Sequence, residues 1–249
     1  MLRRRVHSFV IIFLFFSSLL VTIVGAVAES TSVTLQRNGA AYAQTSSEEA
    51  VAAGIQSAVL DNGLTVLMQS MHSTPLIGIS VVYGAGSAND NKDEAGVAHL
   101  LEHMLFKGTE ERPIRFGRLF HALGSSTNAL TVEDRTVYHH LVAGRDKISA
   151  ILMLEADRML NTQILDEELA TEKNVVAAER KKWENDSITL LNTVLFQAAY
   201  PNRAYGSPIL GTETSIEGLT EAQVRAFYKK YYSPSNATLI LIGDFDVDE

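Results

Sequence analysis

The apolar run from Ala95 to Thr109, "AGVAHLLEHMLFKGT", constrains the fold of this chain more than any other stretch. Its Val, Ala, Leu, Met and Phe residues predict a helix that is buried almost all round and ends at Gly108. Three polar side chains, His99, Glu102 and His103, interrupt the run within five residues. A carboxylate buried there without a partner would cost on the order of several kcal/mol, so the fold must bring compensating groups to this helix.

The three polar side chains lie on one face of the expected helix. At 3.6 residues per turn, His103 lies about 40° from His99, and Glu102 lies about 60° to the other side. Two neutral imidazoles four residues apart suit one tetrahedral Zn²⁺, and a carboxylate beside them can take a proton from the water that the ion holds. The alternative is a helix with a few polar surface positions, although the apolar flanks leave almost no face for solvent. The pattern therefore favours a site for one zinc ion per chain.

The first 28 residues form a separate segment. A basic start at Arg3–Arg5 precedes an apolar stretch, Phe9–Val24, and an A-x-A pattern at Ala26–Ala28. This order predicts a secretory signal peptide that is cleaved after Ala28. The apolar stretch is slightly long, so an uncleaved N-terminal anchor formed by residues 9–24 stays open as the alternative. In either case we expect an exported chain, periplasmic or secreted, and only an uncleaved segment would attach it to a membrane.

The rest of the chain has the composition of an ordinary globular protein, with 46% apolar and 20% charged residues. Residues 29–53, which are rich in small and polar side chains, are expected to form a flexible leader, and 54–249 the folded domain. The net charge of −8, with no long basic run, argues against binding to nucleic acid. The absence of cysteine excludes disulfides, thiolate metal sites and Cys nucleophiles.

Strand and helix patterns alternate irregularly along the folded part. Hairpins are expected at Asp61–Gly63 and around Glu133–Asp134, because turn residues there separate apolar alternation on both sides. The expected helices lie at 95–108, 116–123, 146–160, 167–183, 187–200 and 220–232, and the expected strands lie within 57–70, 76–86, 125–142 and 236–246. The sequence therefore predicts an α+β fold, with a mostly antiparallel sheet packed against helices.

The stretch "GSANDNKDEAGVAHLLEHMLFKGT" contains H-x-x-E-H, the inverted form of the commoner zinc-protease signature. It closely resembles the zinc-site region of the pitrilysin/insulinase family of metalloendopeptidases, to which the mitochondrial and chloroplast processing peptidases also belong. The resemblance extends from about Gly54 to Asp246. It implies the fold of the mitochondrial-processing-peptidase-like metallohydrolase domain, and a hydrolase that acts in the proteolysis of peptide or protein substrates.

The same resemblance implies the roles of individual residues. This family takes its third zinc ligand from a glutamate far downstream on another helix, and here Glu179 lies 76 residues after His103. The implied site is therefore a zinc ion held by His99, His103 and Glu179, with Glu102 as the general base. Glu172, one heptad before Glu179, is implied as a residue that orients a ligand. For either downstream glutamate alone, an ordinary exposed acid is the alternative interpretation.

The segment "TNALTVEDRTVYHH" looks like the family's strand beside the zinc, an edge strand that pairs with extended substrate through main-chain hydrogen bonds. Asn128 and Ala129 are the matching positions, with plain strand packing as the alternative. The family also pairs a zinc-bearing half with a similar half that lacks the motif, so this chain resembles the N-terminal catalytic half alone. The partner half is expected in cis, if the chain is truncated, or in trans.

Two interpretations of function stay open. The first is an exported zinc metalloendopeptidase, or its catalytic subunit, and retention of Glu102 favours it because a scaffold has no need of a general base. The second is a zinc-binding but inactive half that serves as a partner-binding subunit, and the missing second half favours it.

Overall fold

The computed structural model describes residues 54–201 and 203–247. The expected signal segment, 1–28, and the expected leader, 29–53, lie outside the described residues. Within the described part of the chain, no helix combines the length and the apolar character needed to cross a membrane.

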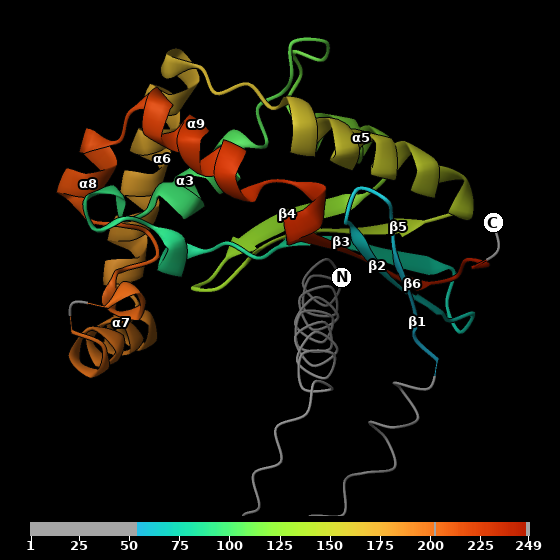
Figure 1. Cartoon of the computed structure of the whole chain (residues 1–249), viewed down its shortest axis with the longest axis horizontal. Helices are drawn as coiled ribbons and strands as arrows, with labels where there is room; N and C mark the ends of the chain where they lie inside the picture. Colours follow the sequence, from blue (N-terminus) through green and yellow to red (C-terminus); the bar gives the residue numbers. More distant parts are fainter. Residues whose placement is uncertain (1–53, 202, 248–249) are drawn as a thin grey trace, which may run out of the picture. The chain divides into compact units, whose positions relative to one another are not determined.

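Six strands form one sheet in the order β1-β2-β6-β3-β5-β4 (Figure 1). Their bounds are Gln56–Val59 for β1, Thr65–Ser70 for β2, Leu76–Tyr83 for β3, Ser126–Thr131 for β4, Thr136–Ala143 for β5 and Ala237–Gly243 for β6. Four of the five pairings are antiparallel, and β2 pairs with β6 in parallel. The predicted α+β class with a mostly antiparallel sheet is confirmed.

The helices gather on and beside this sheet. Their bounds are Val97–Met104 for α3, Phe116–Ala122 for α4, Ile148–Asn161 for α5, Asp166–Glu184 for α6, Ser187–Ala199 for α7, Glu213–Gly218 for α8 and Glu221–Tyr231 for α9. Figure 1 shows α5 lying along the sheet, while α3, α6 and α8 cluster towards its left-hand end and α9 runs from this group to the sheet. The short helix α8 was not predicted from the sequence.

Turn chemistry explains both predicted hairpins. Between β1 and β2, Gly63 adopts φ +86°, and the Asn62 side chain accepts a hydrogen bond from the Leu64 backbone N–H at 3.1 Å. Between β4 and β5, the Val132 N–H donates to the Arg135 carbonyl at 3.0 Å and closes a two-residue turn. Each turn fixes the register of the strands that it joins.

Helix α3 is shorter than predicted. It ends at Met104, because the following backbone tightens into bonds that span three residues instead of four: Phe106 N–H to His103 O and Lys107 N–H to Met104 O. Gly108, the predicted end, adopts φ +154°, where an added Cβ would lie only 2.7 Å from the Arg112 carbonyl oxygen. The tightened turn carries Lys107 into the buried interior.

A buried ion pair within α5 contacts two residues of β5. The Arg158 side chain is 0% exposed, donates to both carboxylate oxygens of Glu155 at 2.6 Å, and lies over the Tyr138 ring, with its Cζ 4.1 Å from the ring centroid. Glu155 also bonds His140 Nε2 at 2.6 Å. His140 is therefore part of a buried cluster that links β5 to α5.

Glu155→Ala is expected to lower the free energy of unfolding by about 3–5 kcal/mol, because it leaves the Arg158 guanidinium buried without its acidic partner. Chemical denaturation of the metal-free chain measures the loss. The matched control is Glu184→Ala, which breaks an ion pair with Arg180 at a side chain that is 52% exposed and should cost less than about 1 kcal/mol. A similarly small loss for Glu155→Ala would contradict the expectation.

Candidate metal centre

Helix α3 carries His99, Glu102 and His103 into the larger of two apolar clusters. Residues on all sides of the helix are fully buried: Val97, Ala98, Leu100, Leu101 and Met104. His99 and Glu102 are 5% and 8% exposed, and His103 is half-buried. The helix packs against α6 and α9. The polar groups of the predicted motif thus lie in a largely desolvated environment, as the apolar flanks indicated.

The start of α3 is fixed from a distance in the sequence. The Asp90 carboxylate accepts hydrogen bonds from the backbone N–H groups of Gly96 at 2.7 Å and Ala98 at 3.2 Å, which have no partner within the helix. Gly96 adopts φ +92°, and an added Cβ would approach the backbone of Gly211 to 2.9 Å. The backbones of Gly96 and Gly211 therefore lie very close together. This approach and the two hydrogen bonds to Asp90 fix the start of α3, and with it the position of His99 in the first turns of the helix.

Helix α6 brings Glu179 to the two histidines. Its Oε2 lies 3.8 Å from His99 Nε2 and 3.5 Å from His103 Nε2. One possible ligand atom from each of the three residues lies within 4.8 Å of the other two. The structure therefore brings together the three predicted ligands, from helices that are far apart in the sequence.

These separations suit a zinc ion. Ligand atoms about 2.0–2.1 Å from a tetrahedral zinc lie about 3.3–3.4 Å from one another. The two distances to Glu179, 3.5 and 3.8 Å, need to contract by only a few tenths of an ångström, and the donor atoms of the two histidines lie within 4.8 Å of each other and would also move closer around the ion. Two imidazoles and one carboxylate are also a common donor set of catalytic zinc sites, in which the fourth position is left open. By geometry and by donor chemistry, the residues present fit the ion.

Glu172 contacts the histidine that the resemblance indicated. Its Oε2 lies 2.9 Å from His103 Nδ1, on the ring atom opposite the one that faces Glu179. The hydrogen bond with His103 holds the pKa of Glu172 at about 2. Burial alone would lower the pKa of His103, but its hydrogen bonds to the two glutamates outweigh burial and raise that pKa to about 9. Burial and the neighbouring His103 lower the pKa of His99 to about 4.

Glu102 has a partner that sequence reasoning missed. The Thr131 hydroxyl, at the end of β4, donates to Glu102 Oε2 at 2.5 Å, and the Thr136 hydroxyl lies 3.5 Å from Thr131. Burial raises the pKa of Glu102, and the Thr131 hydrogen bond lowers it by less. Thr131 lies three residues after Asn128 in the predicted strand, but no local pattern indicates that its side chain meets α3.

Lys107 is the second residue that sequence reasoning missed. Its ammonium lies 2.6 Å from Glu172 Oε1 and 2.6 Å from Glu168 Oε2. The sequence indicated only that Lys107 is an unusual lysine in a mostly apolar run, one helical turn after His103, and not which acids it contacts.

Asn128 and Ala129 lie on β4, which forms one edge of the sheet. Backbone groups alternate along an antiparallel pair, so the Val132–Arg135 hydrogen bond sets which residues of β4 face β5. By this alternation the N–H and C=O of Asn128 face β5, whereas those of Ala129 face away from it. Only Ala129 of the two predicted positions therefore presents its main chain at the edge.

Comparison with known proteins gives this geometry its context. The family model described as insulinase, peptidase family M16, matches residues 65–213, and the model of the peptidase M16 inactive domain matches 218–249. A curated protein from Rickettsia felis named "Uncharacterized zinc protease" is 31% identical over 191 residues, which is 76% of this chain and 46% of the relative. The chain thus spans about half the length of the curated relatives it matches.

Solved structures show the same fold. A protease from Helicobacter pylori matches with a TM-score of 0.74 at 30% identity, over 78% of this chain and 47% of that one. A peptidase M16 inactive domain from Pseudomonas fluorescens matches with a TM-score of 0.70 at 25% identity, over 78% and 47% of the two chains. Because the insulinase model matches more than half of the residues of this chain, the chain belongs to peptidase family M16.

Proposed function

We propose that this chain is the metal-bearing half of an exported zinc-dependent metalloendopeptidase, with one zinc ion held by His99, His103 and Glu179. One observation carries the proposal: donor atoms of these three residues, from two separate helices, lie within 4.8 Å of one another. Relatives named zinc proteases support the choice of metal and of reaction. In this proposal, residues 54–249 are the zinc-binding peptidase domain and correspond to the N-terminal half of the family unit.

Glu102 is the general base in this proposal. A zinc ion bound by His99, His103 and Glu179 would supply a Lewis acid that polarises the peptide carbonyl and lowers the pKa of the attacking water towards about 7. Glu102 would accept a proton from this water as the water oxygen bonds to the carbonyl carbon, and would pass it to the amine nitrogen as the C–N bond breaks. The Thr131 hydroxyl holds Glu102 Oε2 and leaves the other carboxylate oxygen for this transfer. The raised pKa of Glu102 strengthens it as a base, compared with an exposed glutamate.

The edge of β4 is the proposed site for the substrate's main chain. An extended peptide can add a strand to an exposed edge, because main-chain hydrogen bonds are independent of side-chain identity. Ala129 offers its N–H and C=O there, and Asn128 offers its exposed side chain on the neighbouring position. The same strand carries Thr131, which bonds the proposed base. Peptide or protein substrates would thus be aligned beside the group that performs the proton transfer.

A second, zinc-free half of the same fold is the proposed partner, in cis or in trans. The support is that the curated relatives are about twice as long, and that an M16 inactive domain shares this fold. The same observation favours the alternative function, a zinc-binding but inactive half that binds a partner. Export rests on the pattern of residues 1–28, and N-terminal sequencing of exported protein tests it, with Glu29 expected as the first residue.

Peptide hydrolysis tests the proposal. The purified chain, assayed with a library of internally quenched peptides, is expected to cleave faster when a zinc-free family half from the same organism is added. A zinc chelator should abolish the cleavage, and added Zn²⁺ should restore it, because removal of the ion removes the Lewis acid. Cleavage that survives chelation would exclude the metal mechanism. Zinc binding without any cleavage in the presence of that half would favour the inactive subunit.

A further inference from the structure

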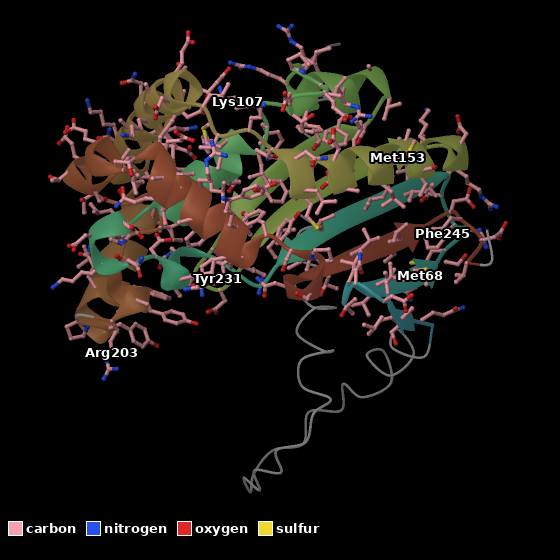
Figure 2. The ribbon with its side chains drawn as sticks, turned by 45° about the horizontal axis from the view of Figure 1, so that its top comes forward. Met68, Lys107, Met153, Arg203, Tyr231 and Phe245 are labelled. Carbon is pink, nitrogen blue, oxygen red and sulfur yellow. The ribbon has the colours of Figure 1, made fainter. Side chains whose placement is uncertain are left out.

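Lys107 places a positive charge in the interior, one turn after the second histidine of the motif. Lys107 is labelled in Figure 2. Its side chain is 7% exposed, and its Nζ lies 2.6 Å from one oxygen of Glu172 and 2.6 Å from one oxygen of Glu168. A buried ammonium is costly unless it is paired, so these contacts need a reason. The simplest reason is an ion pair that holds the turn after α3 against α6.

The carboxylate of Glu172 links Lys107 to the metal site. Its Oε1 contacts the ammonium of Lys107, and its Oε2 lies 2.9 Å from His103 Nδ1. The two oxygens of Glu172 therefore have separate partners, one on α3 and one in the turn that follows it. Glu172 cannot turn away from His103 without also separating its Oε1 from the ammonium of Lys107, with which it forms a close, buried ion pair.

The orientation of Glu172 decides which ring nitrogen of His103 is available. A proton on Nδ1, donated to Glu172, leaves the lone pair of Nε2 for an ion, and Nε2 is the atom that lies 3.5 Å from Glu179. We propose that Lys107 is a positioning residue for the metal site: it fixes Glu172, which fixes His103 in the form that binds zinc. This inference rests on the proposed zinc site, and it adds a residue that acts on the site without touching the ion.

The possible roles of Lys107 predict different changes in zinc affinity when the residue is replaced. A positive charge near a cation site repels the ion, so loss of Lys107 would tighten zinc binding if its charge were all that mattered. A merely structural ion pair would change stability and leave zinc affinity almost unaltered. Positioning predicts weaker binding, because Glu172 and His103 lose their fixed geometry. Removal of groups that orient metal ligands typically weakens metal binding about 10–100-fold.

The experiment measures zinc affinity of the metal-free full chain by competition with a chromophoric chelator. Lys107→Met is expected to weaken zinc binding about 10–100-fold and to alter the visible absorption of the Co²⁺-loaded chain. The matched control is Glu168→Gln, which removes the other, more exposed acidic partner of Lys107 and should change affinity by less than about fivefold. Lys107→Arg keeps a positive charge beside Glu172 and should lose less affinity than Lys107→Met.

A double-mutant cycle tests the route through Glu172. In a Glu172→Gln background, Lys107→Met should cause no further loss of zinc affinity, since the group through which it acts has already been altered. Zinc binding by Lys107→Met as tight as wild type or tighter, equal losses for the Met and Arg variants, or independent losses in the cycle would each overturn the inference. Wild-type protein that binds no zinc would overturn the zinc site itself, which is a distinguishable result.

Discussion

Glu102→Gln is expected to lower kcat/KM for peptide hydrolysis about 10²–10⁴-fold, the usual contribution of a general acid–base group. Glutamine has nearly the same shape and can still accept the Thr131 hydrogen bond, but its amide cannot take a proton from water. The expected loss therefore falls on the chemical step and leaves the ligands in place. Initial rates with a quenched peptide, measured together with the zinc content of the same samples, separate the two effects.

The control for this substitution is Glu217→Gln, the same change at an exposed position of α8, which should keep the wild-type rate. Undiminished hydrolysis by Glu102→Gln would remove Glu102 from the proton-transfer role. A loss of activity that is accompanied by loss of zinc would assign Glu102 to the metal site rather than to the proton transfer.

His103→Ala and Glu179→Ala are each expected to weaken zinc binding by more than about 100-fold, beyond the loss typical of groups that only orient ligands. The wild-type chain should carry close to one zinc ion, because its three donors are already within 4.8 Å of one another. Each substitution removes one of only three protein ligands and leaves the other two unable to complete a tetrahedral site. Elemental analysis after dialysis, followed by chelator competition, measures the effect.

Matched controls are His121→Ala on α4 and Glu167→Ala on α6, both exposed side chains outside the site. Equal zinc content in wild type and in both site variants would eliminate the assignment. Loss of zinc in His103→Ala alone would identify an acid other than Glu179 as the third ligand, and Glu172 is the carboxylate next in reach of His103.

The part of the site that lies on α3 could be predicted because helix geometry is local. Spacing alone puts His99 and His103 on one face, and the structure brings both to the same carboxylate. Glu179 needed the family resemblance, since nothing in the spacing of a single chain indicates that a residue 76 positions away returns to the same point. Thr131 and Lys107 were missed for the same reason: their partners are set by how strand and helix pack, not by neighbours in the sequence.

Helix α7 shows a second limit of sequence patterns. The helix was predicted at 187–200 and is found at Ser187–Ala199, but periodicity does not say which side meets the rest of the protein. Its partly covered residues include Thr189, Thr193 and Phe196, while most of its large apolar residues are exposed: Ile188, Leu190, Leu191, Val194 and Leu195. The usual assumption that the apolar side faces inward fails here, because α7 mainly contacts α6 and the short turn Ala204–Gly206, and no residue of α7 is fully buried.

The position of β4 at the border of the sheet also creates a risk of aggregation. A border strand with outward amides is a template on which another chain can build, including a misfolded copy of the same protein. The strand is only six residues long, and its alternate positions carry Thr127, Ala129 and Thr131, which are small or polar. The short length of β4 and these small or polar side chains limit aggregation. The edge of the strand can therefore stay accessible to a peptide without pairing with other copies of the chain.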